Sequence, residues 1–219
     1  PVLLKEVVDS LDVKDGEVYL DGTLGLAGHA STILKSSGKK TKIIGFDKDG
    51  DSLEKSKKII EKMGYKPTLF NESFANIKQA LDKENIKSVD KILLDLGLSS
   101  PQLDSSGRGF SFRFDEPLLM TMKDNPDTNI LTAKDLLKVL SKDNLTSIIK
   151  NYGEERYAKG IVNKIAEIRK EKPIETTWQL VEIIKSAVPS SYRNGRLHPA
   201  TKTFQALRMA VNNELEDLE

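Results

Sequence analysis

The chain of 219 residues contains no cysteine, two histidines and one tryptophan. The lack of cysteine excludes disulfides, thiolate nucleophiles, iron–sulfur clusters and cysteine-ligated zinc, and two histidines leave little for a histidine-rich site, so we expect no metal. No apolar run approaches the roughly 18 residues of a membrane span. The first residues, PVLLKEVVDSLDV, mix acidic and apolar side chains, unlike a signal peptide. A soluble, cytoplasmic protein without membrane contact is expected.

An excess of charge of one sign is also missing, because 34 Lys and Arg side chains oppose 33 Asp and Glu side chains. With a net charge of +1, an anionic partner must be bound by a local basic patch. Arginine is confined to the chain from Arg108 onward, and it is a good phosphate ligand and a stacking surface for bases. This points to anion or nucleic-acid contacts in the second half, although the feature alone fits a solvated helical surface better.

Short β-rich runs alternate with helix-like segments between residues 17 and 97. The runs are EVYLD, KIIGFD, PTLF and KILLDLG. The segments between them are AGHASTILKS, DSLEKSKKIIEKM and FANIKQALDKE, whose apolar residues recur at spacings of three and four. The alternation predicts an α/β fold in which βαβ units build a doubly wound, mainly parallel sheet with helices on both faces.

The alternation stops after residue 98. Residues 99–126 are rich in Gly, Pro, Asp and Phe without a clean period, and a connection this long suggests a function. Helical patterns follow, including one with a cap at Thr176 and a core position at Trp178. We expect residues 104–199 to form a mainly helical inserted domain. We also expect residues 200–219 to form one long amphipathic helix that returns to cover the sheet, which would make the core domain 1–103 plus 200–219.

The segment DGTLGLAGH, residues 21–29, links the first predicted strand to a helix and carries Gly22, Gly25 and Gly28. Glycines permit a tight turn and close approach of a ligand, and the helix start offers free N–H groups. The spacing differs from the G-x-G-x-x-G dinucleotide fingerprint, which weakens an NAD-dependent dehydrogenase as an alternative. An acid followed by this loop suits a ligand with hydroxyls and a cationic amino acid portion.

Two further strand-end acids accompany this loop. Asp47 follows the second strand, where a carboxylate can accept hydrogen bonds from both ribose hydroxyls. A helix cap is the alternative, and Asp49 or Asp51 could also provide that cap. Asp95 follows the fourth strand, near the point where parallel sheets bind ligands, and a turn residue is its alternative role.

These motifs, with the sequence around them, resemble the bacterial RNA methyltransferases of the MraW type. The matching blocks are PVLLKEVV, YLDGTLGLAGH, GFDKD, ILLDLGLSSPQLD, RGFSF, YGEERYAKGI, HPATKTFQALR and VNNELEDLE. The resemblance implies a Rossmann-like class I methyltransferase fold. It also implies S-adenosylmethionine-dependent methylation of a cytosine N4 in the decoding (P-site) region of 16S rRNA in the small ribosomal subunit. Whether the protein is a monomer or a homodimer stays open.

The family continues past VNNELEDLE into further strands. We therefore expect the C-terminal strands of the fold to be missing from this chain, which would leave a sheet edge open, lower stability and leave weak or no activity.

The resemblance also implies which residues bind the cofactor. These positions are Ala27, Gly28, His29, Asp47, Phe74, Asp95 and Gln102. The family loop has two adjacent glycines before the histidine, and here Ala27 replaces the first of them. An alanine costs little at negative φ and strains the loop at positive φ.

Asp95 is the candidate catalytic residue. The sulfonium methyl is already activated, so the enzyme mainly holds donor and acceptor in line, and a carboxylate that accepts from the cytosine amine would orient it. The base must be unpaired or flipped out. RNA contacts are expected from Arg108, Phe110, Arg113, His198, Lys202 and Arg208. A small aromatic core is the alternative for the phenylalanines, and a non-catalytic RNA-binding assembly factor is the alternative function.

Overall fold

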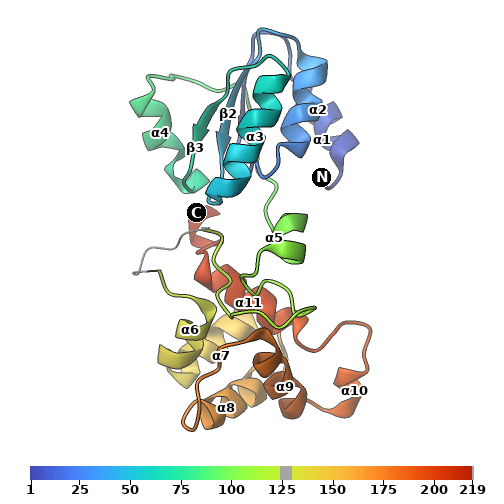
Figure 1. The fold of residues 1–219 in the computed structure, drawn as a ribbon, viewed down its shortest axis with the longest axis vertical. Coiled ribbons are helices and arrows are strands. Elements are labelled where there is room, and N and C mark those ends of the chain that lie inside the picture. The colour runs from blue at the N-terminus through green and yellow to red at the C-terminus, as the bar shows by residue number, and fades with distance from the viewer. Residues whose placement is uncertain (124–129, 219) are drawn as a thin grey trace. The chain divides into compact units, whose positions relative to one another are not determined.

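Residues 1–123 and 130–218 are described by the structure, a computed structural model. Part of the predicted aperiodic segment, residues 124–129, and residue 219 of the predicted last helix lie outside the described residues. The chain divides into two units, residues 1–99 and 100–219, and each is described by itself (Figure 1).

The first unit is built on a four-stranded sheet in the order β3-β2-β1-β4. Its strands are β1 (Val18–Asp21), β2 (Lys42–Phe46), β3 (Thr68–Phe70) and β4 (Lys91–Leu93). All three pairings are parallel, and the register sets Asp21 between Gly45 of β2 and Leu93 of β4. The predicted α/β fold with a parallel sheet is confirmed. The strand order reverses between β1 and β4, so a ligand is expected at the carboxyl ends of these two strands.

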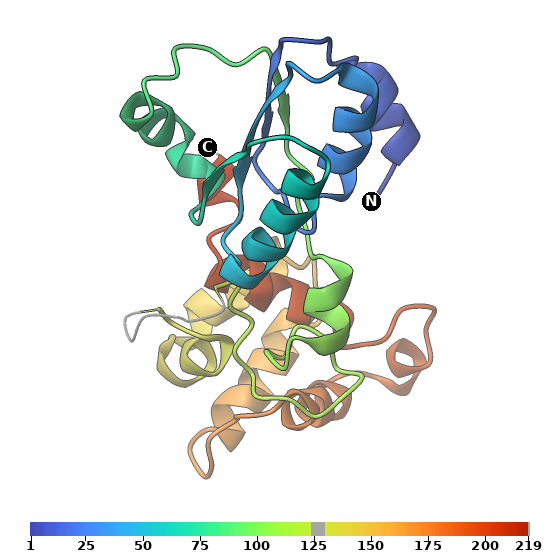
Figure 2. The ribbon, with the colours of Figure 1, turned by 45° about the horizontal axis from the view of Figure 1, so that its top comes forward.

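Helices cover both faces of the sheet because neighbouring residues of a strand point to opposite sides. The helices are α1 (Leu4–Leu11), α2 (Gly28–Ser37), α3 (Gly50–Lys62), the 3-10 turn η1 (Phe74–Asn76) and α4 (Ile77–Lys83). Tyr19 of β1 packs with residues of α1, α2 and α3, whereas Leu20 packs with Ala80 of α4. Figure 2 shows α4 on the other side of the strands from α2.

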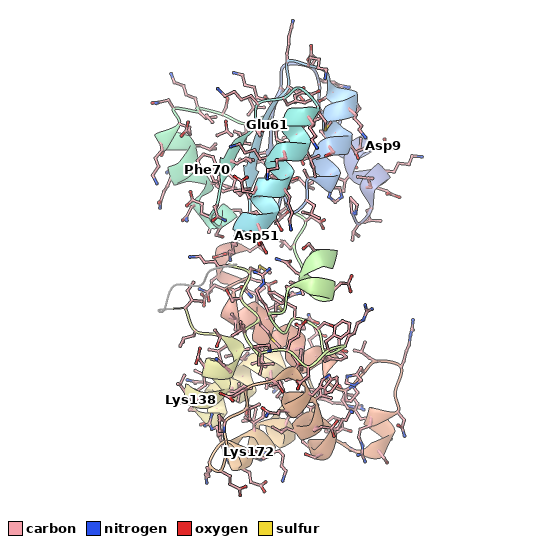
Figure 3. All side chains as sticks on the ribbon, in the orientation of Figure 1. Asp9, Asp51, Glu61, Phe70, Lys138 and Lys172 are labelled. Carbon is pink, nitrogen blue, oxygen red and sulfur yellow. The ribbon has the colours of Figure 1, made fainter. Side chains whose placement is uncertain are left out.

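The α4 face of the sheet is covered unevenly. Phe46 and Phe70 stack at 4.8 Å between ring centroids, and Figure 3 labels Phe70 on the side of α4. Ile92 of β4 lies beside Leu20 in the register but is 48% exposed. The edge strand β4 therefore presents an apolar side chain to solvent in the described structure.

The second unit is helical. Its elements are α5 (Ser100–Ser105), α6 (Ala133–Val139), α7 (Lys142–Asn151), α8 (Ala158–Ile168), α9 (Thr177–Ala187), α10 (Ser190–Arg193), α11 (Thr201–Val211) and the 3-10 turn η2 (Glu216–Leu218). Helix α11 packs on α6 and α7, α7 packs on α8, and α8 packs on α9. Because α11 packs in this unit, the observed division differs from the predicted one, in which residues 200–219 joined the core domain.

Helix ends depart from the sequence pattern where the backbone turns left-handed. The predicted last helix stops at Val211, because Asn213 has φ 52°. The predicted cap at Thr176 is confirmed, and its capping box with Gln179 starts α9.

Trp178 corrects one expectation. It is 52% exposed, because the buried face of α9 is formed by Leu180, Ile184 and their neighbours. The tryptophan is therefore a surface residue and not a core residue.

The segment 106–122 contains no helix or strand, yet hydrogen bonds hold it against the helices. The Leu118 N–H donates to the Glu175 carbonyl at 2.7 Å. Asn212, at the end of α11, donates from Nδ2 to the Met120 carbonyl and accepts from the Met122 N–H, both at 2.7 Å. One amide side chain thus joins this segment to the last long helix.

Candidate functional site

The glycine loop after β1 crosses the carboxyl ends of the neighbouring strands. The Gly22 N–H donates to the Leu93 carbonyl of β4, and the Leu24 N–H donates to the Phe46 carbonyl of β2, each at 2.9 Å. A Cβ atom at Gly22 would lie 2.4 Å from Leu94 Cδ2, so the close approach of β4 requires glycine here. The loop is therefore fixed at the point where the strand order reverses.

Asp47 lies against this loop. Its carboxylate accepts from the Gly25 N–H at 2.7 Å and from the Asp49 N–H at 2.8 Å. Asp49 caps α3 by accepting from the Ser52 N–H at 3.1 Å, so the helix cap is provided by Asp49 and not by Asp47. The structure brings the Asp47 carboxylate and the glycine loop together, and the ribose contact stays a prediction.

Ala27 is the N-cap residue of α2 and has φ 56°. It is fully buried, and its N–H donates to the Leu24 carbonyl at 2.8 Å. Alanine in this conformation is strained relative to glycine. The condition under which the alanine was expected to strain the loop therefore holds.

His29 and Asp95 meet above the loop. The His29 Nε2 atom lies 2.9 Å from the Val2 carbonyl oxygen, and Nδ1 lies 3.4 Å from Asp95 Oδ2. The Asp95 N–H donates to Thr23 Oγ1 at 2.6 Å. The His29 side chain is 7% exposed and that of Asp95 is 41% exposed. The Asp95 carboxylate is thus held beside the loop while part of it remains open to a ligand.

Asp21 is a buried carboxylate that the predicted site residues did not include. Burial, opposed in part by the Tyr19 hydroxyl that donates to it at 2.9 Å, raises the pKa of Asp21 to about 6. The Thr23 N–H also donates to it, at 3.1 Å. An acid at the end of a buried strand, directly before a glycine, was the signal in the sequence. Asp21 therefore contacts the glycine loop through its hydrogen bond from the Thr23 N–H.

Phe74 and Gln102 complete the predicted cofactor positions. Phe74 begins η1 and is half-buried, and a Cβ atom at Gly22 would lie 3.1 Å from Phe74 Cβ. This places the ring's attachment point at the glycine loop. Gln102 is buried in α5 of the second unit, so its role at the pocket stays a prediction.

The predicted RNA-contacting residues after Asp95 are engaged within the second unit. Arg108 donates to the Met122 carbonyl at 2.9 Å and lies 5.6 Å from the centre of the Phe110 ring. Phe110 is buried, and Arg113 pairs with Asp104 at 3.0 Å. Arg113 is exposed and its pairing is a surface contact, whereas Phe110 belongs to the core.

The basic residues around α11 also have protein partners. Lys202 donates to the Glu154 carbonyl at 2.9 Å, and Arg208 faces Glu214 with two nitrogen–oxygen distances of 2.7 and 2.9 Å. The His198 ring stacks on Phe112 at 4.4 Å. Burial, with a smaller effect of Lys185, lowers the pKa of His198. Their phosphate contacts stay predictions.

The described residues contain neither a metal-binding cluster nor a membrane-spanning helix. No group of three or more His, Asp or Glu side chains there is arranged to hold a metal ion. No helix in the described ranges is long and apolar enough to cross a membrane.

Comparison with known proteins identifies the family to which this chain belongs. Residues 1–219 match the family model described as the MraW methylase family. This chain belongs to that family. Among curated relatives, "Ribosomal RNA small subunit methyltransferase H" of Geotalea daltonii is 47% identical over 218 residues. The protein of the same name from Halothermothrix orenii is 46% identical over 219 residues. In both cases the match covers 100% of this chain and 69% of the relative.

Proposed function

We propose that the chain is an S-adenosylmethionine-dependent methyltransferase that modifies the N4 atom of a cytosine in the decoding region of 16S rRNA, within the small ribosomal subunit. Membership of a methylase family, and relatives named for small-subunit ribosomal RNA, support the reaction class and the substrate. The cytosine position rests on the sequence resemblance.

One observation favours this cofactor over a dinucleotide. Two acidic residues flank the loop. The Asp47 carboxylate accepts a hydrogen bond from the Gly25 N–H at 2.7 Å, and the backbone N–H of Asp95 donates to Thr23 Oγ1. S-Adenosylmethionine has ribose hydroxyls and a cationic amino acid portion, which both suit carboxylates, whereas a pyrophosphate does not. The residues present fit the group: Asp47 would hold the ribose, and the loop would hold the amino acid portion.

The mechanism asks little acid–base chemistry of the protein. S-Adenosylmethionine, when bound, supplies an activated methyl group. The protein's part is to hold the target amine in line with it and to exclude water. Asp95, which is 41% exposed beside the loop, would accept a hydrogen bond from an exocyclic amine and favour the positive charge that develops on it. The largely buried His29, whose Nδ1 atom lies 3.4 Å from Asp95 Oδ2, would help to orient that carboxylate.

Calorimetry with S-adenosylmethionine and with NAD tests the cofactor. Wild-type protein should bind S-adenosylmethionine, and Asp47→Asn should weaken binding about tenfold or more, because the variant has no charged hydrogen-bond acceptor at this position. Asp51→Asn is the matched control, since this acid lies in the first turn of α3 and is exposed (Figure 3). Tight binding of NAD, or unchanged affinity in Asp47→Asn, contradicts the proposal.

Transfer of labelled methyl to small subunits that lack the mark tests the reaction. Asp95→Ala should reduce transfer while S-adenosylmethionine binding persists in part. If the wild-type protein binds RNA but neither binds the cofactor nor transfers a methyl group, the non-catalytic assembly factor is the better description.

A further inference from the structure

A long acid-free stretch surrounds α10. From residue 183 to residue 213 the chain has no Asp or Glu, but it has five Lys and Arg and one His. A chain with a net charge of +1 therefore carries a local positive segment. Such clustering is the electrostatic footprint of an anionic partner.

Most arginines of the chain are already used by the protein. Five of the seven have a hydrogen bond, an ion pair or a ring contact: Arg108, Arg113, Arg156, Arg169 and Arg208. Arg193 and Arg196 are exposed, and their guanidinium groups have no partner among the described residues. Both belong to the acid-free stretch. The arginines that remain available thus lie on one short segment.

A cavity of about 450 Å³ opens beside this segment. It is lined by Lys185, Ser190, Arg193, Asn194, His198 and Pro199. The lining offers two cations and several hydrogen-bond donors but no carboxylate. Lys185 does pair with Glu182 at 2.8 Å, yet the Glu182 side chain is 72% exposed, and an exposed pair of this kind is weak.

The walls of the cavity are held in place by buried contacts. Tyr192, next to Arg193 on α10, donates from its hydroxyl to Glu155 at 2.6 Å, and Glu155 is 1% exposed. The Tyr157 ring lies 4.9 Å from that of Tyr192. On the other wall the His198 ring stacks on Phe112. The cavity is therefore preorganised, which lowers the cost of ordering it around a ligand.

We propose that this cavity binds a backbone phosphate of single-stranded RNA, with Lys185 and Arg193 supplying the charge and Ser190, Asn194 and His198 supplying hydrogen bonds. Arginine and lysine bind phosphate in this way, and the exposed Arg196 can contact the phosphate that follows. The inference deepens the proposed function and rests on it for the identity of the anion as RNA.

Fluorescence anisotropy with a labelled, mixed-sequence oligoribonucleotide of about 12 nucleotides tests the site, a length within the range of single-strand sites. The double variant Lys185→Gln with Arg193→Gln should bind about tenfold or more weakly. The slope of log K against log salt should become less steep by about 0.7, because the variant neutralises one phosphate fewer. Inorganic phosphate in millimolar excess should compete weakly with wild type, and a free-anion site would instead bind it as well as RNA.

Two single variants make the result specific. Lys172→Gln removes one positive charge in the turn between α8 and α9, away from α10, and should leave binding unchanged (Figures 1 and 3). Glu182→Gln frees Lys185 and should strengthen binding, which a misfolded variant would not do. Equal losses in Lys172→Gln and the double variant, or an unchanged affinity in the double variant, overturn the proposal.

The two proposals fail in different ways. If the protein binds S-adenosylmethionine and transfers methyl groups, but the Lys185 and Arg193 substitutions leave RNA affinity unchanged, the cavity is not the phosphate subsite. If RNA binding follows the cavity residues but no cofactor binds, the phosphate subsite stands and the methyltransferase assignment is wrong.

Discussion

Asp21 makes the stability of the first unit depend on pH. Its pKa rises from 3.8 to about 6 on folding, chiefly because it is buried. Between about pH 4 and 6 the folded state holds more protons than the unfolded chain, so the free energy of unfolding falls as pH rises through this window and stays lower above it. The cost at pH 7 is about 3 kcal/mol. Asp21→Asn should therefore gain stability over wild type as the pH rises from 4 to 7.

Urea unfolding followed by far-UV circular dichroism at a series of pH values measures this difference. Asp12 is the control of opposite sign, because a hydrogen bond and charge from Lys14 lower its pKa. The stability that Asp12 contributes is lost as pH falls below about 3.8, so the difference between wild type and Asp12→Asn should shrink there. A difference between wild type and Asp21→Asn that is constant with pH would contradict the buried charge.

Ala27 balances two opposing terms in the loop. Its left-handed backbone costs about 1–2 kcal/mol relative to glycine, while its buried methyl group contributes about 0.8 kcal/mol and glycine carries an entropic cost of its own. Ala27→Gly should therefore stay within about 1 kcal/mol of wild type. Ala27→Val should destabilise by more than about 2 kcal/mol, because a β-branched residue fits neither the φ angle nor the packed site. Urea unfolding checks both, and a stable Ala27→Val would contradict the assigned backbone.

The sequence predicts the position of a functional side chain where the backbone fold determines that position. It predicts less well which distant side chain becomes its partner. The position of Asp47 beside the glycine loop follows from parallel strands ending at one edge. The pairing of Arg113 with Asp104, and of Arg208 with Glu214, depends on side-chain placement that a one-dimensional pattern does not contain. Phe110 shows the same limit, since its spacing suited an RNA contact while its burial makes it core.

Elements were predictable where a period and a cap coincide. The four strands and the helix capped by Thr176 match their patterns. The end of α11 does not match, because apolar and acidic residues continue past Val211 while the chain turns at Asn213. Helix α11 packs on α6 and α7. Its amphipathic pattern predicts a buried face but does not predict which apolar surface covers it.

Asn212 fixes the irregular segment to α11, so its removal should be costly. Asn212→Ala would leave the Met120 carbonyl and the Met122 N–H without their partner and should destabilise by about 2–4 kcal/mol. Asn212→Asp keeps the acceptor but not the donor and should be intermediate. Urea unfolding measures the loss. Gln205→Ala, on the exposed face of α11, should stay within about 0.5 kcal/mol, and an equal loss there would contradict the specific role of Asn212.

Each unit contains buried residues of its own, so we predict two unfolding transitions. Trp178 is the one tryptophan of the chain, and its fluorescence follows the second unit, whereas far-UV circular dichroism follows both. Ala27→Val should lower the midpoint of the transition that belongs to the first unit, as seen by circular dichroism. The midpoint of the Trp178 fluorescence signal should not change. If both signals shift together, the units unfold as one.

The bonds made by Asn212 also set an order of events during synthesis. The residues it holds, Met120 and Met122, precede it by about 90 positions. At roughly 5–20 residues per second, a ribosome needs about 5–20 s to add that length. During this time the nascent chain has the four described strands of the sheet but not Asn212, which binds segment 106–122. Segment 106–122 is therefore accessible to chaperones and to the ribosome surface until Asn212 has been synthesised.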